Sequence, residues 1–548
     1  MPTLPTIARL CRAHLLLFSL LIICHSACCA VEIGPRLLPG SADRLTIIDS
    51  TALQRVRAWA EALQRGALAQ NGIVGLSVRR ASDGYCVFGQ NEHISLATAS
   101  TLKLVTTATA LATLGSTYSY TTTLEYDGVI RDSTLQGNLY LRGTGDPSLA
   151  SGRFAGYPAW VTFLKSVSNT VRQAGIRRIS GAVVGDASFY DDMPTPDTWP
   201  YGDLGNYYGA GLFGLNFNEN LYRVAFKTGP AVGASAPIAR LDPAMPYLAL
   251  TNHVVTDQPT TGDEVMIYGA PFQNTVTLEG TVPANSPEFI VKGSMPDPAY
   301  FVAYALTEQF RRDSIRVTGA PMSYRVGTSP TGVVVAGVGN DVPGTIGMNE
   351  ASVAGKPLRR TEITRYLSPP LSDLARETNF QSINLYAEAL MRSAAQKLTQ
   401  NPPAIPARSW PASISAITGF WQNKGVDLSG FRPRDGSGLS TVGAMTTANM
   451  TGILAAMTRE AAYPAFYASI PVVGRTGTVK NLAKNTKAAG NIRAKSGTIE
   501  GVRAYAGYFT TTDGSLMCFS FMVNKYAEGK YAALTPQIEK LFVLLVGL

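Results

Sequence analysis

Ser100 and Lys103 are the first residues in the chain whose types and spacing could perform chemistry. A serine hydroxyl becomes a nucleophile when a base accepts its proton, and a lysine amine can be that base when its surroundings lower its pKa. Residues three apart on a helix lie on one face, so a helix here would bring the two side chains together. If the helix begins near Ser100, its free N–H groups and dipole would also favour the oxyanion of acyl transfer. The pair therefore indicates serine acyl transfer, although an ordinary serine and lysine near a helix start would have the same spacing.

A Ser-His-Asp triad is a weak alternative for this serine. Apart from the first thirty residues, the chain has only two histidines, His93 and His253, and neither lies in a recognisable catalytic setting. No group of cysteines and histidines has metal-ligand spacing, so we expect neither a metal nor another cofactor.

Two later segments could complete a serine-lysine site. Ser382-Ile383-Asn384 stands just before a helical run, where its hydroxyl could relay a proton to a leaving amine and its amide could hold a substrate backbone. Lys495-Ser496-Gly497-Thr498 leads into two strand-like runs. A lysine and two hydroxyls at a strand edge could bind a terminal carboxylate, and the glycine lets a substrate lie against the strand. Arg475-Thr476-Gly477-Thr478 has a similar pattern, but a polar, lysine-rich loop comes after it, so we prefer Lys495.

Periodicity predicts the elements that must position these motifs. Helices are expected at 53–68, 97–114, 371–398, 414–424, 446–459 and from about 535, and strands at 72–80, 85–90, 503–510 and 516–524. Short β-like runs broken by Gly, Pro, Asp and Asn fill most of 116–355, with one helix at 298–312. The simplest architecture is an α/β domain built from both ends of the chain and interrupted by an inserted β-rich region.

The three motifs occur in the order that is the signature of penicillin-binding proteins and serine β-lactamases. From about residue 50 to the C-terminus the chain resembles the low-molecular-mass class C penicillin-binding proteins, the D-alanyl-D-alanine carboxypeptidase/endopeptidase family. Nearly 280 residues separate Lys103 from Ser382, far more than separate these two motifs in a single-domain β-lactamase. A gap of this size resembles the one that holds that family's two inserted domains. The resemblance is carried by Ala99-Ser100-Thr101-Leu102-Lys103, Gly145-Asp146-Pro147-Ser148-Leu149, Ser368-Pro369-Pro370-Leu371-Ser372, Ser382-Ile383-Asn384, Asp435-Gly436-Ser437-Gly438-Leu439-Ser440 and Lys495-Ser496-Gly497-Thr498.

The resemblance implies a penicillin-binding/serine β-lactamase-like fold of the α/β (α+β) class, with a five-stranded antiparallel sheet flanked by helices and interrupted by inserted β-rich domains. The expected divisions are a signal peptide at 1–30, a discontinuous catalytic domain at 31–115 and 356–548, inserted domain II at 116–225 and 301–355, and inserted domain III at 226–300.

The resemblance also implies a catalytic role for five residues. Ser100 would be the nucleophile and Lys103 its base. Ser382 and Lys495 would manage the proton that reaches the leaving D-alanine. Asn384 would orient the substrate.

The lysine-hydroxyl-glycine strand would bind the substrate. The N–H groups of Ser100 and Thr498 would form the oxyanion hole. The hydroxyls of Ser496 and Thr498 would lie near the terminal carboxylate, and Gly497 would let the substrate approach.

Three departures from the family's pattern concern substrate binding. Ser496 replaces the commoner threonine and keeps the hydroxyl, Thr441 stands where relatives often have arginine, and Glu500 where a glutamine can occur. In relatives the glutamine position and an acidic residue after a Trp-Pro segment line a pocket for the side-chain end of the stem peptide, which makes Asp203 the candidate here. A pocket with Asp203 and Glu500 but no arginine is expected to prefer an amine-ended or amidated side chain, because carboxylates repel one another. The alternative is a surface carboxylate with no substrate role.

The N-terminal segment indicates export. Arg9 and Arg12 precede an apolar run at 15–24 and small residues up to Ala30, the pattern of a secretory signal peptide. The run is shorter than the roughly 20 residues that span a bilayer, which favours cleavage near Ala30 over a retained anchor. Lipid attachment at Cys28 is a third, weaker interpretation. We expect a periplasmic or extracellular protein associated with the cell envelope.

Cysteine content and charge restrict the possible partners. A mature chain would keep only Cys86 and Cys518, which we expect to be buried thiols rather than a disulfide. The net charge of +9 comes from scattered basic residues. Peripheral association with anionic cell-wall polymer or lipid therefore stays open, no motif supports nucleic-acid binding, and the oligomeric state is not defined.

The predicted function is a serine-type D-Ala-D-Ala carboxypeptidase, a DD-endopeptidase, or both, which acts on peptidoglycan stem peptides and is inhibited by β-lactams. A β-lactamase is the rival from the same superfamily, but the sequence has no dedicated deacylating glutamate motif. A non-catalytic cell-wall binding scaffold is a rival from another class, although all the expected side chains are present. A general esterase fits less well, because the carboxylate-binding strand favours a free C-terminal substrate.

Overall fold

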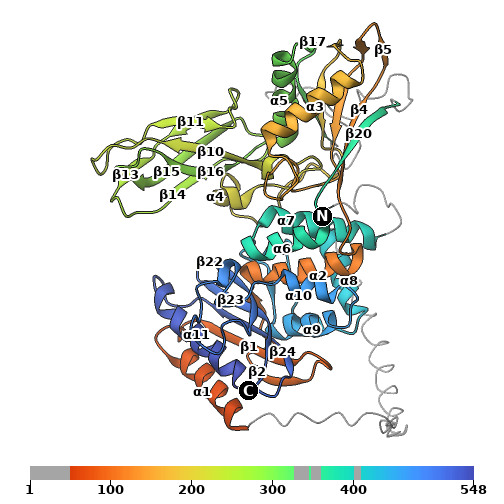
Figure 1. Ribbon diagram of the computed structural model, residues 1–548. Helices are drawn as coiled ribbons and strands as arrows, with labels where there is room; N and C mark the ends of the chain where they lie inside the picture. The colour runs from red at the N-terminus through yellow and green to blue at the C-terminus, as the bar shows by residue number, and fades with distance from the viewer. Residues whose placement is uncertain (1–49, 326–344, 347–358, 400–408) are drawn as a thin grey trace, which may run out of the picture. The chain divides into compact units, whose positions relative to one another are not determined.

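A five-stranded antiparallel sheet joins the two ends of the described chain. The structure is a computed structural model that describes residues 50–325, 345–346, 359–399 and 409–548, so the predicted signal peptide at 1–30 lies outside it. The sheet order is β2-β1-β24-β23-β22, which puts β1 from the start of the chain beside β24 from its end (Figure 1). The strands are β1 (Ile73–Arg80), β2 (Cys86–Gln90), β22 (Arg493–Ile499), β23 (Val502–Thr510) and β24 (Leu516–Asn524). The two predicted strand pairs and the predicted five-stranded sheet are confirmed.

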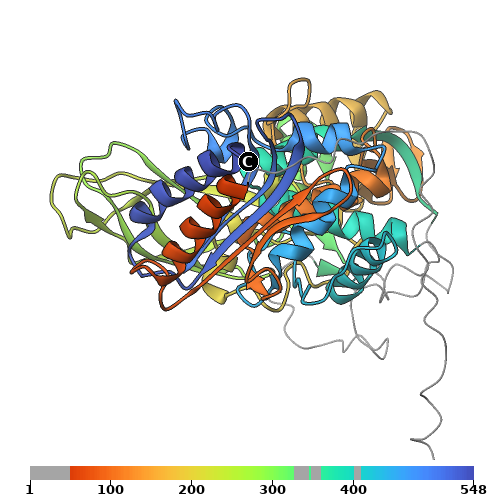
Figure 2. The same ribbon diagram turned by 90° about the horizontal axis from the view of Figure 1, so that it is seen from below.

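Helices cover both faces of this sheet, which explains why β23 and β24 are apolar along nearly their whole length. α1 (Ser50–Arg65) and α11 (Tyr531–Val546) lie side by side on one face (Figure 2). α2 (Leu102–Leu114) and α9 (Thr447–Met457) pack on the other face. α11 begins before the predicted position 535 and contains Pro536 in its interior.

A group of helices continues from α2 on that second face. It consists of α6 (Leu371–Gln381), α7 (Asn384–Leu398), α8 (Trp410–Gln422) and α10 (Tyr463–Ser469). The single helix predicted at 371–398 is wrong in one respect. Ser382 adopts a left-handed backbone conformation, φ 60° and ψ 39°, which ends α6 and lets α7 start in a new direction.

The inserted region contains two modules. The first is a six-stranded sheet of order β19-β18-β9-β7-β4-β20, covered by α3 (Trp160–Gln173) and α5 (Pro298–Arg312). Its strands are β4 (Thr121–Tyr126), β7 (Leu139–Arg142), β9 (Val183–Asp186), β18 (Met322–Tyr324), β19 (Thr345–Ile346) and β20 (Thr361–Leu367), with a small sheet of β5 (Val129–Arg131), β6 (Thr134–Gln136), β8 (Arg178–Ile179) and β17 (Arg316–Val317) beside them. The helix predicted at 298–312 is confirmed, whereas α3 was not predicted.

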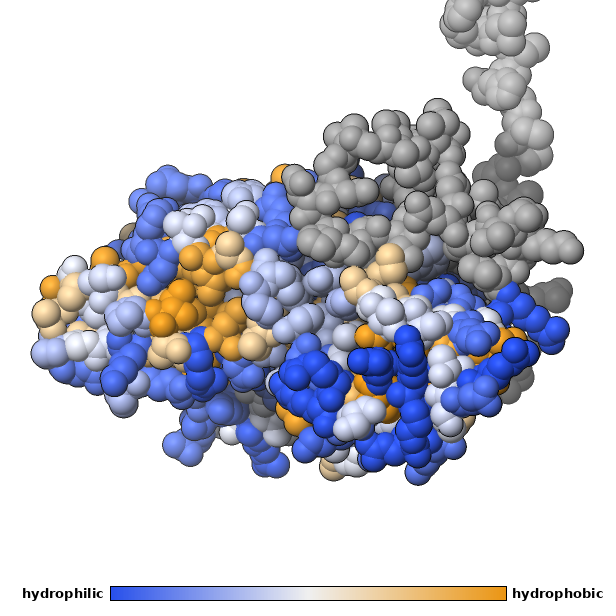
Figure 3. Space-filling model, turned by 90° about the horizontal axis from the view of Figure 1, so that it is seen from above, coloured by the Kyte–Doolittle hydropathy of each residue, from blue (hydrophilic) through white to orange (hydrophobic). Residues whose placement is uncertain are grey.

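The second module is built from β-strands alone between 221 and 294. Its strands are β10 (Leu221–Phe226), β11 (Ile238–Asp242) and β16 (Phe289–Ser294) in one sheet, and β12 (Ala249–Asn252), β13 (Val255–Asp257), β14 (Glu264–Tyr268) and β15 (Thr275–Pro283) in another. On the face drawn in Figure 3, apolar side chains gather over this module, whose exposed residues include Val232 and Ile290.

Strand pairing moves one predicted domain limit. β20 pairs with β4 along its length, from Thr361 opposite Tyr126 to Leu367 opposite Thr121. Residues 361–367 therefore belong to the inserted sheet and not to the catalytic segment 356–548, because hydrogen bonds across the sheet fix a strand to its neighbour. The other predicted limits stay predictions.

Candidate active site

Ser100 lies in a tight turn at the start of α2. The turn, η1 (Ala99–Thr101), is a 3-10 helix that leads directly into α2, and Ala99 has a φ of 44°. The segment 435–440 packs against this turn at Gly438, whose φ of 78° and contact with the Ala99 carbonyl leave no room for a side chain. Ser100 itself is partly exposed, so the turn holds the nucleophile without sealing it.

Lys103, the residue predicted as the base for Ser100, is buried. Its Nζ lies 2.9 Å from Ser100 Oγ, 2.6 Å from Asn384 Oδ1 and 2.9 Å from the Ser437 carbonyl oxygen. A neutral amine has two N–H groups and one lone pair, so it can donate to Asn384 and Ser437 and accept from the Ser100 hydroxyl. Burial lowers the pKa of Lys103 to about 7. A substantial fraction of the amine is therefore unprotonated at neutral pH and can act as a base.

The break between α6 and α7 delivers Ser382 and Asn384 to the same place. Asn384 is the first residue of α7, and its Nδ2 donates to the Tyr208 carbonyl at 2.7 Å while its Oδ1 faces Lys103. Both ends of the amide are thus held. Its orientation is fixed by one partner from the inserted region and one from the catalytic domain.

Lys495 contacts Ser382. Its Nζ donates to Ser382 Oγ at 2.9 Å and to the Ser496 carbonyl at 2.7 Å. The side chain is fully buried, and burial lowers its pKa well below the ordinary value, helped by the positive charges of Lys103 and Arg503. Ser382 therefore has a proton donor or acceptor beside it that can change charge during a reaction.

Gly497 lets β22 approach the nucleophile turn closely. A Cβ built at this position would lie 2.8 Å from the Thr98 carbonyl, 2.9 Å from the Ser100 nitrogen and 3.0 Å from Ala99 Cβ. The backbone of β22 consequently runs beside the Ser100 N–H, as an oxyanion hole made from Ser100 and Thr498 requires. The side chains of Ser496 and Thr498 alternate with Lys495 and lie at the open edge of the sheet.

The segment Arg475-Thr476-Gly477-Thr478 is not a second site but a neighbour of the first. It forms the short 3-10 turn η7 (Gly477–Val479) rather than a strand. Ser496 Oγ donates to Thr478 Oγ1 at 2.7 Å. This arrangement supports the preference for Lys495, since Lys495 is the lysine beside Ser382.

Glu388 and Asp435 form a buried acidic layer behind Lys103 that sequence reasoning did not assign. Glu388 Oε2 accepts from the Gly436 N–H at 2.7 Å, and Asp435 accepts from Gly438, Ser440 and the Trp199 indole. Both carboxyls raise the pKa of Lys103 and so partly offset the lowering that burial causes. Burial raises the pKa of Glu388 itself to about 8. The one available signal for Glu388 was its place four residues after Asn384, which puts both on one face of α7.

Among the described residues, the predicted substrate-pocket residues make no direct hydrogen bond to the residues of the three motifs. Asp203 is half-buried on α4 (Tyr201–Leu204), its Oδ1 accepts from the Tyr208 hydroxyl at 3.3 Å, and burial raises its pKa. The Tyr208 carbonyl also accepts from Asn384, so Tyr208 and Asn384 both lie between Asp203 and Lys103 in the hydrogen-bond chain. Glu500 follows β22 and Thr441 follows the 435–440 segment, and both are exposed with no polar contact to Asp203 among the described residues.

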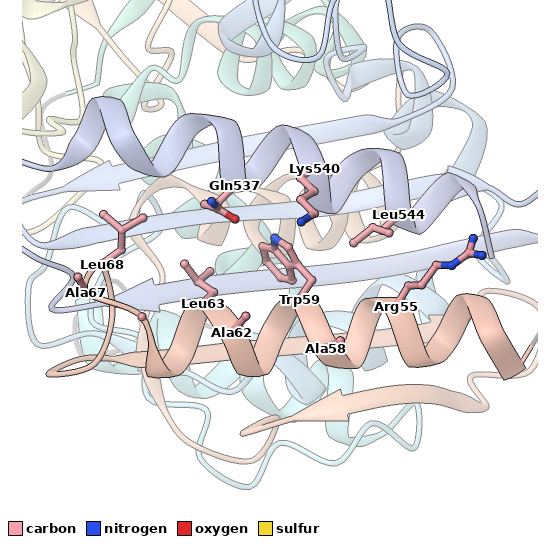
Figure 4. Close-up of a pocket in the computed structure, with 11 residues that line it drawn as sticks. Arg55, Ala58, Trp59, Ala62, Leu63, Ala67, Leu68, Gln537, Lys540 and Leu544 are labelled. Carbon is pink, nitrogen blue, oxygen red and sulfur yellow. The ribbon is translucent and has the colours of Figure 1, made fainter.

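Other features do not add to this site. Cys86 and Cys518 are free thiols, as predicted, although Cys86 is only partly buried. Across the described ranges, no three His, Cys, Asp or Glu side chains are arranged to hold a metal, and no helix has the length and apolar character of a membrane span. A cavity of about 660 Å³ lies between α1 and α11 with Trp59 on its floor (Figure 4), and none of the motif residues lines it.

Comparisons with known proteins agree with this geometry. The chain matches the D-Ala-D-Ala carboxypeptidase 3 (S13) family over residues 56–337 and 334–541. A D-alanyl-D-alanine carboxypeptidase of Actinomadura sp. (strain R39) is 24% identical over 514 residues, which cover 92% of this chain and 87% of the relative. The D-alanyl-D-alanine carboxypeptidase DacB of Haemophilus influenzae is 21% identical over 475 residues, 86% of this chain and 89% of the relative. The crystal structure of penicillin binding protein 4 from Haemophilus influenzae has a TM-score of 0.70 at 20% identity, covers 90% of this chain and 99% of that chain, and shares the fold.

Proposed function

The chain belongs to the D-Ala-D-Ala carboxypeptidase 3 (S13) family, and on this premise we propose that it cleaves D-Ala-D-Ala ends of peptidoglycan stem peptides through an acyl-enzyme on Ser100. Membership of this family makes it a serine-type D-Ala-D-Ala carboxypeptidase. DD-endopeptidase action on cross-linked peptides belongs to the same proposal, because both reactions cut after the same D-alanine. The observation that carries the mechanism is the buried Lys103 amine 2.9 Å from Ser100 Oγ.

Acylation begins with proton transfer from Ser100 to Lys103. The Ser100 oxygen then attacks the carbonyl carbon of the penultimate D-alanine, and the Ser100 and Thr498 N–H groups stabilise the tetrahedral oxyanion. The C–N bond breaks as the leaving amine takes, through Ser382, the proton that Lys103 accepted from Ser100, which returns Lys103 to the neutral amine. Lys495 contacts Ser382 at 2.9 Å. A water molecule, activated by the same base, hydrolyses the resulting ester and regenerates the Ser100 hydroxyl.

A β-lactam tests this proposal directly, because its acyl ring opens on the same serine while its leaving group stays tethered. Intact-mass analysis after incubation with benzylpenicillin should show one adduct on the wild type, located on Ser100, and none on Ser100→Ala. An adduct that persists for minutes fits a carboxypeptidase, whereas one that turns over within seconds would favour a β-lactamase. No adduct on the wild type would refute the acyl-enzyme.

The side-chain end of the stem peptide is proposed to contact Asp203, with Glu500 near it and Thr441 in place of an arginine. Two carboxylates without an arginine should prefer an amine-ended or amidated diamino acid over a zwitterionic end. The test compares kcat/KM for amidated and free stem peptides on the wild type and on Asp203→Asn. Equal kcat/KM values for the two peptides on the wild type would remove this part of the proposal.

Export to the cell envelope is also part of the proposal. The substrate lies outside the cytoplasm, and the sequence at 1–30 has the signal-peptide pattern with cleavage near Ala30. N-terminal sequencing of the protein recovered from the periplasm or medium should start at about residue 31. A full-length N-terminus on a cytoplasmic protein would contradict it.

A further inference from the structure

Arg503 is a buried cation beside Thr498, one of the residues predicted to lie near the substrate's terminal carboxylate. It lies on β23 directly opposite Thr498 of β22, so both side chains lie on the same face of the sheet. Its guanidinium donates to Thr498 Oγ1 and to the Tyr531 hydroxyl. It also stacks over the Tyr531 ring at 4.2 Å and the Tyr505 ring at 5.4 Å, and the residue is only 8% exposed.

This cation has no acidic partner among the residues that the structure describes. The contacts that Arg503 and Lys495 make with described residues are hydroxyls, a backbone carbonyl and aromatic rings, and neither forms an ion pair with a described carboxylate. Arg503 Nε is buried without a hydrogen-bond partner among the same residues. A buried guanidinium normally has a carboxylate or phosphate beside it, because losing water without compensation is costly. The site therefore has an unbalanced positive charge next to Thr498.

The two hydroxyls of the β22 motif, on Ser496 and Thr498, differ in whether their protons are free to bind a ligand. Ser496 Oγ donates to Thr478, so its proton is already engaged. Thr498 instead accepts from Arg503, which leaves its own O–H proton for another acceptor and makes it a stronger donor. Thr498 is exposed at the edge of the sheet, where it can meet a ligand.

We propose that Arg503 is the residue that recognises the free C-terminal carboxylate of the peptide substrate, both by its charge and through the Thr498 hydroxyl that it holds. The inference rests on the proposed function and adds a specificity-determining residue that none of the three motifs contains. Tyr531 and Tyr505 act as positioning residues, since their rings fix the plane of the guanidinium. The chemistry required of the ligand is a carboxylate at the end of an extended peptide.

A comparison of two ligands separates this role from a structural one. The ligands are an N-acetylated tripeptide that ends in D-Ala-D-Ala and the same tripeptide with a C-terminal amide. The proteins are the wild type, Arg503→Ala, Arg503→Lys and, as a matched surface control, Arg365→Ala, whose side chain is 62% exposed and pairs with Glu362 in the inserted module. The measurement is kcat/KM for release of the last residue, with thermal melting to check folding.

The expected result is a loss that depends on the ligand's charge. For the free carboxylate, Arg503→Ala should lower kcat/KM by about 10- to 100-fold, the range for a charge-assisted hydrogen bond. For the amide, Arg503→Ala should change kcat/KM by less than about threefold, because the amide lacks the charge. Arg503→Lys should recover part of the loss for the free carboxylate. Arg365→Ala should match the wild type with both ligands. Equal losses for both ligands, or no loss for the carboxylate, would overturn the role of Arg503.

Binding without catalysis keeps this inference separate from the proposed function. Calorimetry on Ser100→Ala and on Ser100→Ala/Arg503→Ala should show that only the first variant binds the carboxylate peptide more tightly than the amide. If the wild type forms no penicillin adduct but Ser100→Ala still binds the carboxylate peptide more tightly than the amide, the proposed acyl-enzyme on Ser100 is refuted. Carboxylate recognition by Arg503 is then retained. If Ser100→Ala binds both peptides equally, the carboxylate site fails whatever the activity.

Discussion

Replacing Gly497 by alanine should move the Thr498 N–H away from the Ser100 N–H, its proposed partner in the oxyanion hole, without removing any reacting group. The added Cβ would lie 2.8 Å from the Thr98 carbonyl, against 3.4 Å for an ordinary contact, a shortfall of about 0.6 Å. The other close atoms, the Ser100 nitrogen and Ala99 Cβ, belong to the same turn, so no flexible side chain can move aside. Either β22 or the turn must retreat by several tenths of an ångström.

The kinetic cost depends on the geometry of the oxyanion hole. Losing one oxyanion donor costs about 10²- to 10³-fold in rate, and a displacement near 1 Å costs about 10²-fold. We therefore expect Gly497→Ala to slow acylation about 100-fold, equivalent to about 2.7 kcal/mol of transition-state stabilisation.

The assay is the acylation rate constant with a fluorescent penicillin under pseudo-first-order conditions. Gly419→Ala in α8 is the matched control, because a Cβ at that position meets nothing within 4 Å. Circular dichroism and melting establish that both variants fold. A folded Gly497→Ala that acylates within about threefold of the wild type, far short of the cost of one lost oxyanion donor, would refute the reasoning.

Three further predictions concern Lys103, Asn384 and Gly419. Acylation requires the neutral amine of Lys103, so with a pKa of about 7 the rate should fall about tenfold per unit as pH drops below 7 and level off above it; a flat profile from pH 5 to 9 would contradict Lys103 as the base. Asn384→Asp would put a carboxylate about 2.6 Å from Lys103 Nζ and favour the ammonium, so the midpoint of that profile should move up by about one unit or more; an unchanged midpoint would argue against the contact. Gly419→Ala should raise the free energy of unfolding by about 0.5–1 kcal/mol in urea titration, because a helical glycine is replaced, and a lower value would show hidden crowding.

The candidate catalytic residues could be proposed from the sequence because each motif belongs to a different element. Ser100 and Lys103 come together if a helix begins at Ser100, and Lys495 is presented if its segment is an edge strand. Local sequence predicts both of these elements. The preference for Lys495 over Arg475 depended on the residues C-terminal to each motif, which form a strand pair after Lys495 and a polar loop after Arg475. In the structure Lys103 lies beside Ser100 and Asn384, and Lys495 lies beside Ser382.

The missed features depend on tertiary contacts that local sequence does not encode. α3 was not predicted because its many Val, Thr and Ser residues favour strands, whereas its buried residues Phe163, Leu164, Val167 and Val171 follow a helical spacing. The turn at Ser382 has no glycine or proline to mark it. The role of Arg503 depends on which residue lies opposite Thr498, and this register is set by the sheet as a whole.

The pairing of β1 with β24 has a consequence for the time at which the enzyme first becomes reactive. A ribosome releases Ser100 and Lys103 several hundred residues before it releases β22 and β24, and the central place in the sheet stays vacant until then. A nascent or truncated chain that stops short of residue 524 carries the attacking hydroxyl without a completed sheet to support the donors around it. The sheet that carries Lys495 and Gly497 is therefore complete only once β24, the strand between β1 and β23, is in place.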